Sequence, residues 1–281
     1  MLITSGLVSA LLGLASAATW GAGDFCGGLA SKRTGLYQVV IGSQLIGVVL
    51  LASLAVLIGE PIPPVINLIG CGLAGLLGVI GLLALYKALA IGRMGIAAPV
   101  SGVLSAAVPV LAGAYLEGWP TQLKLFGFGL ALVGVWLVSR SDNVPIQLRD
   151  LGLPLIAGLS FGMFIVLINR VNAGGVFWPL VAARVASLSG LTVVAFVTRQ
   201  PRLPGRADLP LVGLSGLLDA GGNTFLILAA QAGRLDVAAV LSSLYPASTV
   251  LLAWVILKER LSRWQSVGML AALLAIVLIT I

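Results

Sequence analysis

The sequence contains no histidine, two cysteines and very few charged residues. Charged residues make up 9% of the 281 residues, whereas soluble domains carry about 25%, because their surfaces face water. So small a share excludes a water-facing surface over most of the chain. Cys26 and Cys71 lie in apolar stretches, so neither a disulfide framework nor a metal site is expected. Walker and HExxH motifs are also absent, which argues against direct use of ATP and, together with the lack of histidine, against an intramembrane enzyme.

What the sequence has instead is apolar residues, at 59%, with a mean hydropathy of +1.14 and 36 glycines. Small residues allow membrane helices to approach closely, so the glycines agree with a protein embedded in a lipid bilayer. The net charge of +7 comes from basic residues scattered between apolar runs. A nucleic-acid-binding surface would gather them in one patch, so no nucleic-acid partner is expected.

A helix needs about 20 mostly apolar residues to cross a membrane, and about ten such windows fit the sequence. We expect an all-α integral membrane protein with these spans: Leu2–Gly23, Tyr37–Ile58, Val65–Leu85, Ile96–Leu116, Leu123–Ser139, Leu151–Val171, Val176–Val197, Leu209–Ala230, Val237–Leu257 and Trp264–Ile281. The connections between them are short and carry turn residues, as in Pro63-Pro64. The polar stretch 141–150 is predicted to link a first half, 1–140, to a second half, 151–281.

The two halves resemble each other at a constant offset of 141 residues. Gly92-Arg93 in the first half matches Gly233-Arg234 in the second, and Gly127 matches Gly268. Each half has five predicted helices, and an odd number places the second half upside down relative to the first. Such an inverted repeat is the architecture of many secondary transporters that work by alternating access.

Several segments also resemble the EamA-type transporters of the drug/metabolite transporter superfamily. The resemblance is most specific in the second half, in the segments Leu241–Pro246, Val250–Ala253, Leu257–Leu261 and Gln265–Gly268. A weaker copy runs through the first half, and Ala17, Trp20 and Gly21 fit the opening helix of the family.

The resemblance implies a ten-helix carrier that exports amino acids, other metabolites or drugs. We therefore expect a secondary-active exporter of a small metabolite, in the cell (inner or plasma) membrane, as a monomer or homodimer and without a cofactor. Protons are a candidate coupling ion. A multidrug efflux carrier is a second hypothesis, and a lipid flippase subunit or scaffold without metabolite transport of its own is a third.

Polar side chains at lipid depth are costly and are functional candidates for that reason. Asp219, in the eighth span, and Asp24, just after the first, are the acidic residues that could carry a coupling proton. Since the first helix is expected to end at Gly23, a position of Asp24 at the membrane interface is the alternative. Arg184 needs an anionic partner, and Asp219 is the expected one, either lining the cavity or forming a purely structural pair.

Two prolines, in the fourth and ninth spans, are expected to interrupt their helices next to a substrate cavity. Together with their neighbours the candidates for the cavity are Trp20, Pro99, Ser101, Asp219, Asn223, Ser242, Ser243, Tyr245 and Pro246. For the serines the alternative is helix packing, and for Trp20 it is a place at the membrane interface.

The basic residues divide unevenly between the two sides of the predicted bundle. Lys124, Arg170 and Arg234 lie on the side of the termini, and the other loops hold most of the rest. This bias favours termini outside the cytoplasm. The family resemblance suggests the reverse, and the sequence leaves both orientations open.

Overall fold

The computed structural model describes residues 2–31, 33–90, 94–139, 151–200, 204–205, 207–258 and 262–280. For residues 2–5, 86–90, 94–99, 139, 250 and 280 it describes the helix but not the side chain. The expected linker 141–150 therefore lies outside the described residues.

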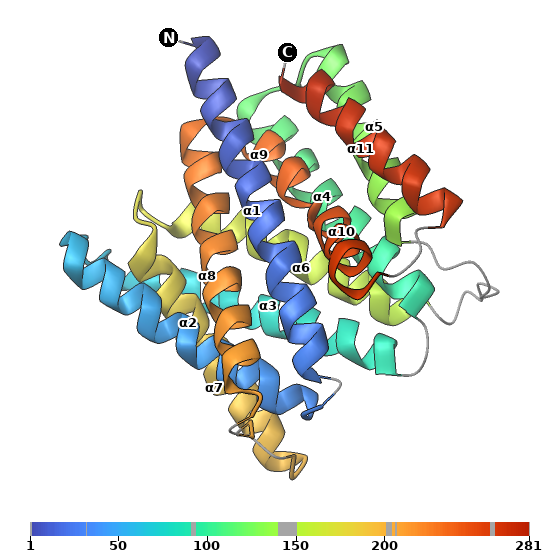
Figure 1. The fold of residues 1–281 in the computed structure, drawn as a ribbon. Helices are drawn as coiled ribbons and strands as arrows, with labels where there is room; N and C mark the ends of the chain where they lie inside the picture. Colours follow the sequence, from blue (N-terminus) through green and yellow to red (C-terminus); the bar gives the residue numbers. More distant parts are fainter. Residues whose placement is uncertain are drawn as a thin grey trace.

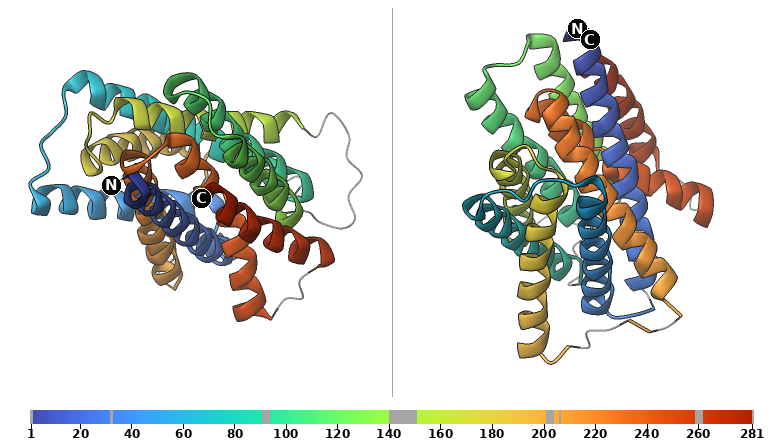
Figure 2. Two further views of the ribbon diagram at one scale, coloured as in Figure 1. Left: turned by 90° about the horizontal axis from the view of Figure 1, so that it is seen from above. Right: turned by 90° about the vertical axis from the view of Figure 1, so that its left-hand side faces the viewer.

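The described chain is helical (Figure 1). The elements are α1 (Leu2–Ser31), α2 (Leu36–Ile58), α3 (Val65–Ala90), α4 (Met94–Glu117), α5 (Gln122–Ser139), α6 (Gly152–Val171), α7 (Phe177–Val197), α8 (Leu209–Ala232), α9 (Leu235–Ser242), α10 (Tyr245–Leu257) and α11 (Arg263–Thr280). Eight segments are long and apolar enough to cross a membrane, with α9 and α10 counted as one, and α5 and α11 are shorter apolar helices. Both termini lie at the same end of the molecule (Figure 2), as an even number of crossings requires.

The ninth predicted span is broken in the middle. The helix stops at Ser242, and a new helix begins at Tyr245. Pro246 lies in the first turn of the new helix, where its missing N–H would otherwise bond the carbonyl of Ser242 in a continuous helix. A proline is tolerated in this position because the first N–H groups of a helix have no partner within it. The predicted interruption at Pro246 is therefore present, and it divides one crossing into two independently directed pieces.

The first predicted span is too short. Helix α1 continues past Gly23 to Ser31, which makes it 30 residues long. Two glycines, a carboxylate and a serine lower the hydropathy of this last part, but a helix that packs along a neighbour does not need to be apolar all round. Asp24 therefore lies inside α1, and the expectation that the helix ends just before it is wrong.

The two halves are interlocked rather than stacked as separate bundles. Helix α1 packs along α8, and its counterpart α6 packs along α3. In the same way α4 packs on α6, while α9 and α10 pack on α1. The pairs α5–α11 and α2–α7, at the upper right and lower left of Figure 1, join equivalent helices of the two halves. The most extensive contacts thus cross from one half to the other, and exchanging the halves maps each contact onto another.

Small residues make these crossings close. A Cβ on Gly75 of α3 would collide with the carbonyl oxygen of Ala183 on α7. Along the α1–α8 crossing, the hydroxyl groups of Ser9 and Ser16 each donate to a backbone carbonyl of α8 at 2.8 Å. Without water, such packing and polar contacts hold membrane helices together.

Polar contacts also join the halves at the helix ends. The Glu60 carboxylate, after α2, accepts the backbone N–H groups of Val176, Phe177 and Trp178 at 2.5–3.1 Å. These are orphan donors at the start of α7, where a negative charge is favoured. The hydroxyl of Thr34, before α2, donates to Asp208, before α8. Each half thus supplies one carboxylate that accepts hydrogen bonds from the other half, close to the start of a helix.

The α5–α11 crossing offers a matched test of the interlocking. A Cβ at Gly134 would lie 3.0 Å from the carbonyl oxygen of Gly268, whereas Gly129, on the same helix, has open space around it. We expect Gly134→Val to lower the free energy of unfolding by about 1–3 kcal/mol, because the close contact cannot hold a larger side chain. Gly129→Val is the control. Thermal unfolding in detergent measures the effect, and equal midpoints for the two variants would contradict the close packing.

Candidate substrate site

The polar centre of the molecule is an ion pair between α7 and α8. The Arg184 guanidinium lies 2.6 Å from the Asp219 carboxylate, and its other terminal nitrogen donates to the Gln44 side chain of α2 at 3.0 Å. The Asn223 amide, one turn further along α8, donates to the Asp219 carbonyl at 2.8 Å. Helices of both halves therefore meet in one network.

The two charges of the pair differ in exposure. The side chain of Arg184 is 6% exposed, whereas that of Asp219 is 40% exposed. The guanidinium is locked in the protein, while the carboxylate has a free face. The sequence analysis predicted both residues as partners, and it left open whether the pair is structural or lines the cavity. The exposed face of Asp219 gives it room for a ligand as well.

Two residues of α2 accommodate the Arg184 side chain. A Cβ at Gly47 would lie 2.6 Å from a terminal nitrogen of Arg184, so the glycine leaves the room that the guanidinium occupies. Gln44 lies one turn before Gly47 and supplies the hydrogen bond. Sequence reasoning missed Gln44, although an amide in an otherwise apolar span is a signal by the same rule that selected Arg184.

Asp24 enters the site from α1. Its neighbour Gly23 packs against the Asp219 backbone of α8, where a Cβ would be 3.3 Å from the amide nitrogen. On the other side of the helix, Gly21 packs against the carbonyl of Tyr245 at the start of α10. Asp24 lies between these two faces, is exposed, and interacts electrostatically with both Asp219 and Tyr245. Its side chain therefore faces the space between α8 and α10.

Two aromatic rings stand beside this carboxylate. The rings of Trp20 and Tyr245 are 6.3 Å apart and nearly perpendicular, at 83°. The Trp20 indole rests on Gly222 of α8, where any Cβ would collide with it. The structure thus brings together five of the predicted residues: Trp20, Asp24, Asp219, Asn223 and Tyr245.

The predicted serines lie elsewhere. Ser101, Ser242 and Ser243 are buried. The hydroxyl of Ser243 donates to the Val240 carbonyl at 2.7 Å, and that of Ser242 faces the Gly13 carbonyl of α1 at 3.4 Å. Ser101 lies under Gly158 of α6, where its backbone leaves no room for a Cβ. Their surroundings are those of packing residues.

Of the two predicted prolines, Pro246 is buried at the start of α10, next to Tyr245. It places the Tyr245 ring by starting the new helix rather than by offering a group to a ligand. The side chain of Pro99 lies outside the described residues.

The space around Asp24 is closed toward the termini. In that direction α9 packs against α1, α4 and α8. In the other direction α10 has extensive contacts with α1 and α5 but none of comparable extent with α4 or α8, in the part of the chain that the structure describes. The break at Ser243 and Leu244 thus separates a closed half of this crossing from one that is open among the described residues.

A polar clasp holds the closed end. Arg234, before α9, donates to the carbonyl of Gly118 at 2.7 Å and lies 2.7 Å from the Asp236 carboxylate, which is fully buried. The hydrogen bonds to Asp236 raise the pKa of Arg234 above its ordinary value, so the guanidinium stays charged. Glu117 at the end of α4 accepts the Leu235 N–H. The clasp, formed by Glu117, Gly118, Arg234 and Asp236, joins α4 to α9.

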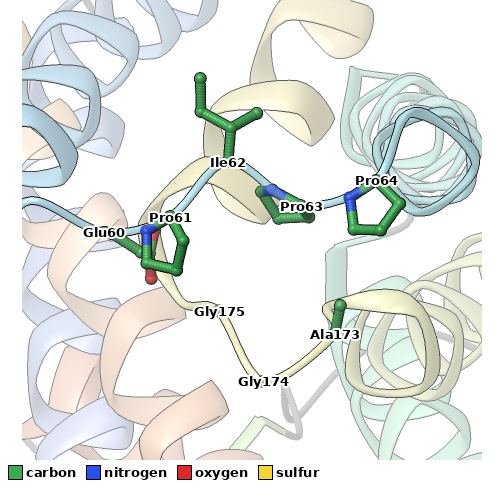
Figure 3. Close-up of a pocket in the computed structure, with 8 residues that line it drawn as sticks. All are labelled: Glu60, Pro61, Ile62, Pro63, Pro64, Ala173, Gly174 and Gly175. Atoms are coloured by element: carbon green, nitrogen blue, oxygen red, sulfur yellow. The ribbon is translucent and has the colours of Figure 1, made fainter.

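A second hollow lies between the α2–α3 and α6–α7 loops (Figure 3). It encloses about 310 Å³ and is lined by Glu60, Pro61, Ile62, Pro63, Pro64, Ala173, Gly174 and Gly175. Glu60 is its charged side chain, and the α7 N–H groups already occupy that carboxylate. Among the described side chains, no group of three or more His, Cys, Asp or Glu converges on a possible metal site. The Asp24–Asp219 region is therefore the stronger candidate for a substrate.

Comparison with known proteins bears on the whole chain. The model of the EamA-like transporter family matches twice, over residues 7–140 and 151–281. No curated protein matches the sequence. A solved structure titled only "Crystal structure of protein" superimposes with a TM-score of 0.78 over 96% of this chain and 95% of its own, at 17% identity. At that identity the likeness shows the fold alone.

The ion pair predicts an asymmetric response to substitution. Asp219→Asn leaves a buried guanidinium without its anion, which costs about 3–5 kcal/mol of stability. Arg184→Gln leaves a carboxylate that already has a solvent-facing side, so its cost is expected to be smaller. The double variant should be more stable than the sum of the two losses predicts. Unfolding in a denaturing detergent measures all three, and strictly additive losses would contradict the pairing.

Proposed function

Because the chain belongs to the EamA-like transporter family, we propose that it is a secondary-active exporter of a small metabolite, an amino acid or a related compound. The family is one of membrane transporters, so the chain is a multi-pass membrane protein that moves a small molecule, and it is not an enzyme. The fold prediction of a helical membrane protein built from two repeats is confirmed by the paired family match. The substrate, the direction and the cell membrane as its location are parts of the proposal.

One observation supports alternating access above the others. The polar network of Gln44, Arg184, Asp219 and Asn223 lies where the halves interlock, and the space beside it is closed at one end by the clasp. In an inverted-repeat carrier the two halves exchange roles, which moves the opening from one side of a central site to the other. The proposed halves, 1–140 and 151–281 with a linker at 141–150, are the units of that exchange.

The charge bias supports a direction. Most basic residues outside the helices lie on the side opposite the termini, which is the side toward which the site is open. The positive-inside rule then places the open end in the cytoplasm, where an exported metabolite is loaded. This orientation is opposite to the one that the family resemblance suggests. A reporter fused to the C-terminus, active only outside the cytoplasm, distinguishes the two.

A multidrug efflux carrier is the second candidate, because Asp24 lies beside the aromatic rings of Trp20 and Tyr245. A site of this kind suits amphipathic organic molecules, whose apolar parts pack on the rings. A flippase subunit or scaffold would transport no soluble substrate. Asp219 would then have no role in transport of a soluble metabolite. Protons remain a candidate coupling ion, for which Asp24 and Asp219 are the described carboxylates at the site.

The export test compares cells that overproduce the protein with empty-vector cells. We expect one small metabolite to accumulate outside the cells only with the intact protein, as measured by mass spectrometry of the medium. Asp219→Asn should return its level to that of the empty vector, because the carboxylate belongs to the central network. Asp208→Asn removes a carboxylate at the helix end and serves as the control.

Amounts of folded protein in the membrane must be equal among the variants. An unchanged medium across a broad panel, in spite of folded protein, would count against metabolite export and favour drug or lipid movement. Export by Asp219→Asn at the level of the intact protein would remove this carboxylate from the mechanism.

A further inference from the structure

We propose that the space between α1, α8 and α10 binds the protonated amine of an organic ligand, with Asp24 as its anion and Trp20 and Tyr245 as its aromatic wall. This inference rests on the proposed function and names the chemical class of the substrate. It follows from the direction of the Asp24 side chain, from the charges around it and from the two rings.

The direction of Asp24 is fixed by its neighbours on α1. Trp20, Gly23 and Gly27 face α8, because they contact Gly222, Asp219 and Ser215. Gly21 faces α10. In a helix of 3.6 residues per turn, position 24 falls between these two faces. A carboxylate in that position is directed between α8 and α10, which have few contacts with each other among the described residues, and its exposure gives a ligand access to it.

The charges at the site do not balance among the described side chains. Two carboxylates, Asp24 and Asp219, interact with each other, and one guanidinium, Arg184, lies in their network. Arg184 is committed to Asp219 at 2.6 Å, and Asn223 supports the same carboxylate. Asp24 has no hydrogen-bond or ion-pair partner among the described residues. A negative charge at this depth calls for a positive partner, and an anionic ligand would be repelled.

The rings decide between an inorganic and an organic cation. The Trp20 and Tyr245 side chains stand in edge-to-face contact, so at least one π face is turned away from the other ring. Cations with organic substituents gain from such faces, since ammonium groups within about 6 Å of a ring centroid are attracted to it. A carboxylate with two adjacent aromatic rings therefore suits an amine that carries apolar groups.

The test measures binding of phenethylamine, which is a cation at neutral pH, to the purified full-length protein by titration calorimetry. The N-acetyl derivative keeps the ring and loses the charge. We expect phenethylamine to bind and the neutral derivative not to bind. Asp24→Asn should weaken the binding of phenethylamine by roughly tenfold or more, because it removes the anion that pairs with the ammonium group.

Matched variants separate binding from folding. Trp20→Phe keeps a ring and should retain most of the affinity, whereas Trp20→Ala should lose part of it. Asp208→Asn, whose carboxylate lies at the start of α8, should bind as the intact protein does. Phenylalanine, which carries a carboxylate in addition to the ammonium group, is the second ligand. If it binds through its ammonium group, its affinity should depend on Asp24 in the same way. If only phenethylamine binds, the site selects amines without a carboxylate.

Equal binding of the neutral derivative, an unchanged affinity in folded Asp24→Asn, or no phenethylamine binding at millimolar concentration would each overturn the amine site. Export of a metabolite without an amine, at the same level in Asp24→Asn, would overturn it and leave the exporter intact. Amine binding through Asp24 without any export would overturn the proposed function and leave the site.

Discussion

The packing of each half of the chain against the other is the constraint on which the rest of the structure depends. Helices α1, α3, α6 and α8 find their most extensive contacts across the halves, and the pairs α2–α7 and α5–α11 do the same. Because glycines such as Gly75 and Gly134 bring these crossings together, there is little slack between the halves. A movement of one helix at one end of the molecule must therefore be answered by its counterpart at the other end.

The packing between the halves explains the positions of the charged and aromatic residues of the candidate site. Arg184 can be buried because α8 offers the Asp219 carboxylate, while α2 offers the Gln44 hydrogen bond and the space beside Gly47, so its burial depends on both halves. Asp24 and Trp20 come from α1 and face α8 and α10, again across the halves. The interruption at Pro246 lets α9 close one end while α10 leaves the other end open. The charged residues, the two aromatic rings and the break between α9 and α10 thus all lie at the interface between the halves.

Much of the fold could be predicted from the sequence, because hydropathy and turn residues record where the chain meets lipid and water. The spans from α2 to α8 begin and end within a few residues of their predicted bounds, α3 apart, which continues five residues beyond Leu85. Helix α1 was predicted too short because its polar end is sheltered by α8 and not by lipid. Asp24 was therefore expected just beyond the helix, and Gln44 was missed. Whether the serines line the cavity or serve helix packing was left open, because which side chains face each other depends on the helix crossings, and no local pattern specifies them.

We expect the interlocked halves to couple the two ends of the site in opposite senses. Paired spin labels at Tyr115 and Gln231 report on the clasped end, and labels at Leu209 and Leu257 report on the open end, in a chain with Cys26 and Cys71 replaced by alanine. All four labelled positions are exposed. Arg234→Gln breaks the clasp, so we expect a longer Tyr115–Gln231 distance and a shorter Leu209–Leu257 distance in the same sample. A longer distance at the clasped end with no change at the other would contradict it.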